Sequence, residues 1–229
     1  TSKGIKTFTC SCGDTYTETI SKLDHTYKTV TSKATLSKNG KSETKCTACG
    51  YVSKTTVIYA PKTVKLSAVS YAYNGKVKTP SVTVKDSKGK KLKNGTDYTV
   101  KYSKGRKSIG KYTVTVTFKG NYSGTKKLNF EIVPAKVTLS KLTAGSKALT
   151  ATWKTVSGVT GYEVQYSTSK KFTSKTTKTV KIKSSKTKKT TIKKLTKGKK
   201  YYVRIRAYKT VNKKPVYGAW SSVKSIKVK

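Results

Sequence analysis

The clearest pattern in the sequence is a strict alternation of apolar residues and threonines from Tyr112 to Phe118. A period of two is typical of a β-strand with one apolar and one polar face. The same alternation occurs at Tyr98–Tyr102, and the residues between the two runs include Gly105 and Gly110. We therefore predict an antiparallel strand pair, closed by a glycine-containing loop, at the centre of a small β-domain.

Short alternating runs continue on both sides of this pair, and turn residues separate them. Val64 with Leu66, Val82 with Val84, and the run from 128 to 132 are further strand candidates. Asn-Gly and Asp-containing turns lie between these runs. Helical periodicity is not convincing anywhere, so the predicted fold class is all-β, built from several small β-domains in tandem.

The chain of 229 residues is too long for one small β-domain and fits two or three. Shifts in composition and the linker ending at Pro61 divide it into segments 1–60, 61–134 and 135–229. The chain begins at Thr1 and contains no methionine, so we expect a fragment or processed form of a longer protein. No apolar run approaches the length of about 18 residues that a membrane span needs.

The charge is strongly basic, with 52 lysines and arginines against 8 carboxylates and a net charge of +44. Most lysines therefore lack a possible ion-pair partner, and the chain is expected to attract polyanions such as acidic cell-wall polymers, mucins or nucleic acid. The alternative is a merely solvated lysine surface. Residues 134–229 hold 26 of the basic residues and one carboxylate, so polyanion binding is expected mainly there.

All four cysteines lie in the first segment, as Cys10-Ser-Cys12-Gly and Cys46-Thr-Ala-Cys49-Gly. A glycine after each pair allows a tight turn that points two thiolates at one metal. We predict one structural zinc ion (Zn²⁺) held by the four cysteines. Two disulfides are the alternative, and His25 could replace one ligand, although a surface role is favoured for it.

Catalysis is not expected from this composition. A single histidine excludes most acid–base schemes, and the eight carboxylates are scattered along the chain. No glycine-rich phosphate loop precedes a helix. Motifs of specific nucleic-acid binding, such as a recognition helix or a two-histidine finger, are also missing.

The strand at Tyr201–Tyr208 has one face with a distinct composition. Tyr202, Arg204, Arg206 and Tyr208 share the outward face and could stack on sugar rings or bases. The favoured alternative is that this face packs against neighbouring strands.

The first segment resembles cysteine-knuckle repeats of large surface proteins from Clostridia-like Gram-positive bacteria. The resemblance rests on TFTCSCGDTYTETI at 7–20, DHTY at 24–27 and TKCTACG at 44–50. Those repeats often read C-x-x-C and GHTY, whereas here Ser11 stands alone between the first two cysteines and Asp24 replaces the usual glycine.

The second segment resembles bacterial Ig-like modules of the same surface proteins. The shared stretches are YNGKVKTPSVTV at 73–84, GTDYTVKY at 95–102, GKYTVTVTFKGNYSGT at 110–125 and FEIVP at 130–134. This likeness implies a spacer or stalk module on a cell surface.

Residues 135–229 resemble a fibronectin type III domain. Trp153 stands where that family buries a core tryptophan, and Tyr201, six residues after Leu195, stands where it places a tyrosine corner. YGAWS at 217–221 resembles the loop before the last strand.

Together these likenesses imply a secreted, non-catalytic spacer or attachment region, and its basic charge predicts binding to acidic cell-wall polymers. The alternative is an adhesin that binds host mucin or another glycan.

Overall fold

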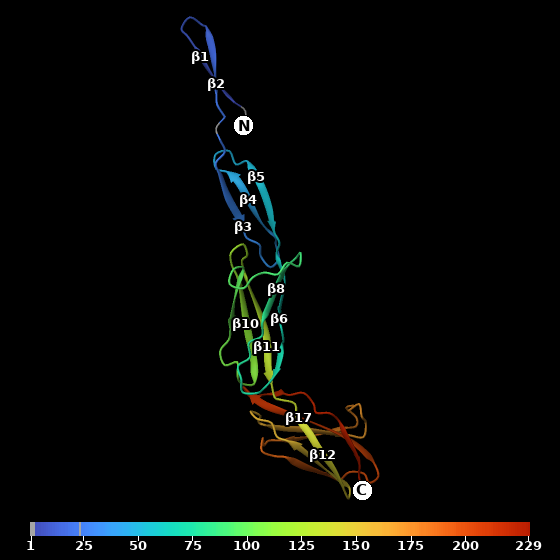
Figure 1. The fold of residues 1–229 in the computed structure, drawn as a ribbon. Helices are drawn as coiled ribbons and strands as arrows, with labels where there is room; N and C mark the ends of the chain where they lie inside the picture. The colour runs from blue at the N-terminus through green and yellow to red at the C-terminus, as the bar shows by residue number, and fades with distance from the viewer. Residues whose placement is uncertain (1–2, 23) are drawn as a thin grey trace.

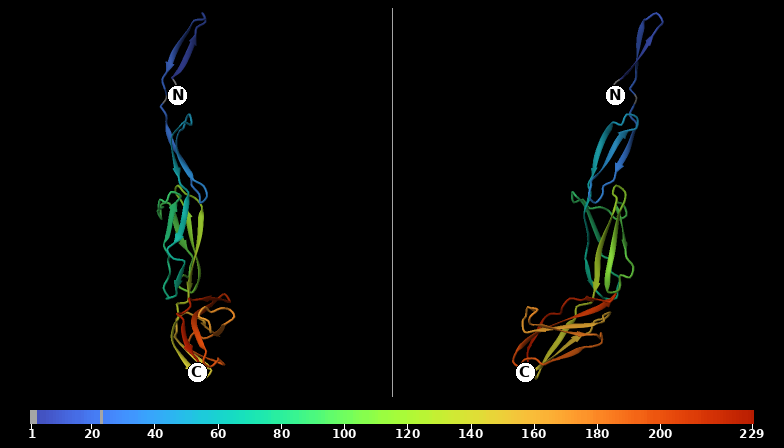
Figure 2. Two further views of the ribbon diagram at one scale, coloured as in Figure 1. Left: turned by 90° about the vertical axis from the view of Figure 1, so that its right-hand side faces the viewer. Right: turned by 180° about the vertical axis from the view of Figure 1, so that it is seen from behind.

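The computed structural model describes residues 3–22 and 24–229, and all regular secondary structure in this part of the chain is β-strand. Nineteen strands form small sheets that follow one another along an elongated molecule (Figure 1). Two further views show the same end-to-end arrangement (Figure 2). The predicted all-β tandem fold is confirmed.

The first segment contains two separate sheets. Strands β1 (Gly4–Thr9) and β2 (Thr15–Ile20) form a hairpin on their own. Strands β3 (Tyr27–Ser32), β4 (Gly40–Cys46) and β5 (Val52–Ile58) form an antiparallel sheet in the order β3-β4-β5. Nearly every residue of the hairpin is exposed, so apolar burial contributes little to it.

The middle module packs a four-stranded sheet against a two-stranded one. The strands are β6 (Pro61–Leu66), β7 (Ser70–Ala72), β8 (Val82–Asp86), β9 (Tyr98–Tyr102), β10 (Gly110–Phe118) and β11 (Thr125–Val133), in the orders β7-β11-β10-β9 and β6-β8. The predicted central pair is present, since β9 and β10 are antiparallel with Val100 opposite Val116. Val114 and Val116 are fully buried, so the apolar face of the alternation forms the core.

The last module is a two-sheet sandwich. Its strands are β12 (Thr138–Gly145), β13 (Ala148–Lys154), β14 (Gly161–Ser167), β15 (Thr177–Ile182), β16 (Lys189–Lys193), β17 (Lys200–Val211), β18 (Lys214–Tyr217) and β19 (Lys224–Lys227). One sheet has the order β12-β13-β16; the other has β15-β14-β17-β18, with β19 also paired to β17. Trp153 and Tyr162 are buried between the sheets with ring centroids 5.4 Å apart.

The β3-β4-β5 sheet is attached to the middle module by hydrogen bonds around Ala34. The amide of Ala34 donates to the carbonyl of Asn121 at 3.0 Å, and the amide of Ser123 donates to the carbonyl of Ala34 at 2.9 Å. Ala34 is completely buried and shares a core with Ile58 and Tyr122. The β3-β4-β5 sheet is therefore anchored at one end rather than loosely tethered.

The joint between the middle and last modules is apolar and tightly packed. One continuous core runs through both, including Ile132 of β11 and Val137 just before β12. An added Cβ at Gly158 would lie 2.5 Å from the ring of Tyr73, because the loop before β14 lies directly against that tyrosine. This close packing, together with the shared core, opposes relative movement of the two modules.

We predict that Gly158→Ala loosens this joint. Gly158 and Gly198 have almost the same positive φ, 75° and 74°, but a Cβ at Gly198 meets nothing within 4 Å. Both alanines should cost roughly 1–2 kcal/mol for left-handed backbone, so Gly198→Ala is the matched control. Small-angle X-ray scattering should show a broader range of shapes only for Gly158→Ala. Equal scattering from the two variants would contradict a rigid joint.

The tyrosine corner is formed as the sequence predicts. The hydroxyl oxygen of buried Tyr201 accepts a hydrogen bond from the amide of Thr196 at 3.2 Å, whereas neighbouring Tyr202 points to the other face of β17. We predict that Tyr201→Phe, which keeps the ring and removes this bond, lowers the free energy of unfolding by about 1 kcal/mol. Tyr202→Phe should change it much less. The reverse order in thermal melts would argue against the corner.

Candidate functional site

One histidine and two cysteines gather at the end of β4. The atoms with which His25, Cys46 and Cys49 could bind a metal ion all lie within 4.8 Å of one another. The Sγ of Cys49 is 3.4 Å from Nδ1 of His25. Pairing of Tyr27 with Cys46 and a 2.9 Å hydrogen bond from the amide of Thr47 to the carbonyl of residue 26 bring the histidine to the cysteines.

The turn after β4 places the two sulfurs together. The amide of Gly50 donates to the carbonyl of Cys46 at 3.0 Å, and Gly50 has a φ of 72° that favours glycine. Hydrogen bonds from the backbone of Cys49, from the side chain of His25 and from the backbone of Ala48 lower the pKa of the Cys46 thiol to about 6. Cys46 therefore carries a thiolate at neutral pH, which is the form that binds metals.

The donor set fits zinc. Zn–S bonds of about 2.3 Å and Zn–N bonds of about 2.0–2.1 Å in a tetrahedron place sulfur and nitrogen ligands about 3.5 Å apart. The distance of 3.4 Å between Cys49 and His25 matches this value. Three protein ligands leave one coordination position for a further group.

The four cysteines do not meet, which corrects the predicted four-sulfur site. Cys10 and Cys12 are bonded to each other as a disulfide at the tip of the β1–β2 hairpin. Cys46 and Cys49 are free thiols in the separate β3-β4-β5 sheet. The arrangement also differs from the alternative of two disulfides. His25, to which we assigned a surface role, is the third potential ligand of the second pair.

The outward face of β17 carries a stack of aromatic rings and guanidinium groups. The guanidinium carbon of Arg204 lies 4.1 Å from the ring centre of Phe172 and 4.4 Å from that of Trp220. Arg206 lies 4.3 Å from Trp220 and 3.7 Å from Tyr217. The order Phe172–Arg204–Trp220–Arg206–Tyr217 joins segments that are distant in the sequence, and we call these five residues the ladder.

The edges of both guanidinium groups are also engaged. Arg204 donates two hydrogen bonds, of 2.9 and 2.7 Å, to Oε1 of Gln165. Arg206 donates two, of 3.0 and 2.7 Å, to Oε1 of Glu163, whose residue is only 7% exposed. Tyr208, expected on the same face, is buried. The structure thus places the arginines in packing contacts between neighbouring strands, as in the favoured alternative.

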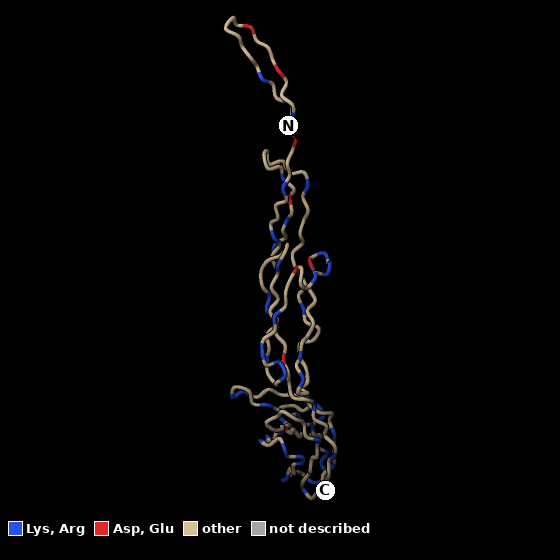
Figure 3. The backbone as a smooth tube through the Cα atoms, turned by 60° about the vertical axis from the view of Figure 1, so that its left-hand side comes forward, with Lys and Arg blue, Asp and Glu red and all other residues tan. Residues whose placement is uncertain are grey.

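The lysines are spread along the whole molecule. Figure 3 shows basic residues on every module and few acidic ones between them. Within residues 3–22 and 24–229, only Lys41 and Lys45 with Glu43, and Arg206 with Glu163, form ion pairs. Most lysines of this region therefore have no carboxylate partner and can interact with external anions.

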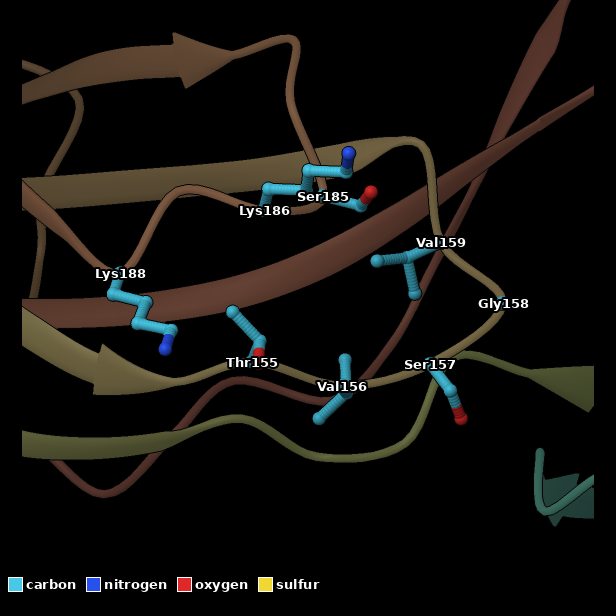
Figure 4. Close-up of a pocket in the computed structure, with 8 residues that line it drawn as sticks. All are labelled: Thr155, Val156, Ser157, Gly158, Val159, Ser185, Lys186 and Lys188. Carbon is cyan, nitrogen blue, oxygen red and sulfur yellow. The ribbon is translucent and has the colours of Figure 1, made fainter.

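A surface depression lies beside the joint of the last two modules. Its volume is about 780 Å³, and it is lined by the turn at 155–159 with Ser185, Lys186 and Lys188 (Figure 4). Its lining includes two ammonium groups and no carboxylate, histidine or cysteine. It therefore offers cationic surface and no acid–base pair.

Comparison with known families identifies the last module. Residues 133–222 match the family described as the fibronectin type III domain. This result agrees with the two-sheet sandwich, the buried Trp153 and the tyrosine corner, so the module is a fibronectin type III domain. Such domains are typical of extracellular and surface proteins. No helix long and apolar enough to cross a membrane occurs among the residues that the structure describes.

Among solved structures, two multi-domain fragments match this chain at low overall similarity. The FN1–FN3 domains of chicken CNTN1 match with 17% identity and a TM-score of 0.38, covering 83% of this chain and 77% of theirs. Domains A168–A170 of titin match with 14% identity and a TM-score of 0.34, covering 98% and 82%. No curated protein matches the chain.

We predict that Arg206→Gln destabilises the fibronectin type III domain. The change removes a stacked cation and leaves the carboxylate of Glu163 buried without its partner, which should cost up to about 3 kcal/mol. Lys214→Gln on exposed β18 removes the same charge without a buried partner and should change stability little. Denaturant unfolding followed by tryptophan fluorescence compares the two. Equal stability of the variants would show that the ladder contributes nothing to folding.

Proposed function

We propose that this chain is a rigid, non-catalytic spacer and attachment region of a protein on the surface of a Gram-positive bacterium. The proposal rests on the apolar cores that continue across the joints from the β3-β4-β5 sheet to the middle module and from there to the last module. Such joints resist bending, so the molecule separates whatever lies at its two ends. The depression beside the last joint and the ladder offer no arrangement suited to catalysis.

Attachment would be electrostatic and multivalent, through lysines that contact acidic cell-wall polymers. The lysines lie on many strands and loops, so each contact is weak and many act together. Every neutralised anion releases a counterion, and binding should therefore weaken steeply as salt rises. The fibronectin type III domain should contribute most, because residues 134–229 hold 26 of the 52 basic residues and only one carboxylate.

A matched pair of charge variants tests this attachment. The first variant changes four exposed lysines of the last module to glutamine: Lys186, Lys188, Lys189 and Lys193. The second variant changes four exposed lysines elsewhere in the chain to glutamine: Lys54, Lys62, Lys65 and Lys76. Retention on purified cell wall, with and without teichoic acid, is measured across a salt series. We expect the first variant to elute at distinctly lower salt than the second.

Two results would contradict electrostatic attachment at the last module. Equal elution of the two variants would show that the location of the charge is unimportant. Binding that persists at high salt would instead favour the second candidate function, an adhesin with a defined site for mucin or another glycan.

The zinc proposal is that His25, Cys46 and Cys49 hold one structural ion. The ion would join the segment before β3 to the turn after β4, in a sheet that has few buried apolar residues. Native mass spectrometry should show one bound zinc in the full chain. Cys49→Ser should abolish binding, whereas the double change Cys10→Ser and Cys12→Ser should leave it intact. Loss of zinc in the double variant, or no zinc in the parent, would overturn this site.

The lowered pKa of Cys46 sets the direction of the pH dependence. The pKa of the Cys46 thiol is about 6 in the folded chain, against 9.0 for a thiol without these hydrogen bonds. The thiolate therefore contributes its full stabilisation to the folded state above about pH 9. That contribution decreases below pH 9 and is lost as the pH falls through 6. Zinc loading should decline over the same acidic range, since protons compete for the ligands.

A further inference from the structure

The β1–β2 hairpin has the same sequence plan as the β4–β5 hairpin. Each begins with a glycine six residues before its first cysteine, at Gly4 and Gly40, and each has a glycine directly after its second cysteine. The full stretches are GIKTFTCSCGDTYTETI, at 4–20, and GKSETKCTACGYVSKTTVI, at 40–58. The second stretch is longer by two residues, one between its cysteines and one at a bulge in its strand pairing.

The two turns also make the same backbone hydrogen bonds. In the first hairpin, the amide of Cys10 donates to the carbonyl of Asp14 at 2.9 Å, and the amide of Gly13 donates to Cys10 at 3.0 Å. In the second, the amide of Cys46 donates to Tyr51 at 2.8 Å, and the Gly50 amide donates to Cys46 at 3.0 Å. Both glycines have positive φ, so these are two copies of one structural unit.

The copies differ in what lies beside them. In the second, β3 pairs with the outer edge of β4, with Tyr27 opposite Cys46, and brings His25 to the cysteines. In the first, β1 pairs only with β2 among the described strands, so its outer edge has no strand and its cysteines have no histidine. The position that β3 occupies in one copy is open in the other.

The hairpin buries almost none of its apolar side chains. Ile5, Tyr16 and Ile20 are 70%, 65% and 51% exposed. Phe8 and Tyr16 stack across the two strands with ring centroids 4.8 Å apart. An isolated two-stranded hairpin is marginally stable in water, and an uncovered edge is a template for a further strand.

We propose that the outer edge of β1 binds a strand of the β3 type, supplied by another polypeptide segment. By equivalence with β3 and β4, the added strand runs antiparallel to β1 and pairs with residues 5–10. A histidine two residues before that strand then lies beside Cys10 and Cys12. When these two cysteines are reduced to thiols, they form a second zinc site together with that histidine. The zinc part rests on the proposed site at His25, whereas the docking of the strand does not.

Formation of the second site requires reduction of the Cys10–Cys12 disulfide. A phosphine supplies the two electrons: it becomes a phosphine oxide by taking the oxygen of one water, and the two sulfurs become thiols with the protons of that water. Zinc binding then releases the thiol protons.

The test adds a peptide of residues 24–32, DHTYKTVTS, to the ¹⁵N-labelled full chain in phosphine, with and without zinc. We expect amide shifts confined to the β1–β2 hairpin, and at least about tenfold tighter peptide binding with zinc, which equals about 1.4 kcal/mol. A peptide with His25→Ala should lose the gain from zinc but keep the shifts. The double variant Cys10→Ser, Cys12→Ser should behave in the same way with the parent peptide.

The outcomes separate the two parts of the proposal. No shifts in the hairpin, or shifts at the edge of β5 instead, would overturn docking at β1. Hairpin shifts without any gain from zinc would keep the docking edge and overturn the second zinc site. If native mass spectrometry finds no zinc on the chain alone, the proposed site at His25 fails, while hairpin shifts without zinc still support docking.

Discussion

The apolar core that crosses the joint between the middle and last modules holds this molecule in its extended shape. The chain carries a net charge of +44, and its modules repel one another at low salt. A loose linker would let that repulsion and thermal motion vary the angle between modules. Burial of Ile132 and Val137 in one core, with Tyr73 packed against Gly158, opposes this variation. Because the joint is rigid, the molecule keeps a defined length although its surface is highly charged.

The amino-terminal end is stabilised differently. Its sheets are too small and too exposed to gain much stability from apolar burial. They are stabilised instead by backbone pairing, by the hydrogen bonds at Ala34 and by the cluster of His25 with Cys46 and Cys49. The β1–β2 hairpin lacks even a third strand. Apolar burial along the molecule therefore increases from the first hairpin towards the fibronectin type III domain.

The ladder shows how packing determines the availability of a charged group. Arg204 and Arg206 lie on the outward face of β17, as their alternation with Val203 and Ile205 indicates. However, Phe172, Trp220 and Tyr217 from other segments cover their faces, and Gln165 and Glu163 bind their edges. These arginines consequently stabilise the sheet, whereas most of the lysines have no carboxylate partner and can interact with anions.

Where apolar and polar residues alternate strictly, the sequence by itself determined a strand and its buried side, because a period of two is local and needs no knowledge of distant residues. The alternation at 112–118 is of this kind, whereas the buried positions of Trp153 and Tyr201 were expected from the resemblance to a fibronectin type III domain. Only the tertiary structure decided which cysteines meet. The loop between Cys12 and Cys46 is long enough to allow several pairings, and the β3–β4 register selected His25 as the neighbour of Cys46 and Cys49. The partners of Arg204 and Arg206 were decided in the same way, because contacts between segments far apart in the chain depend on how the sheets pack.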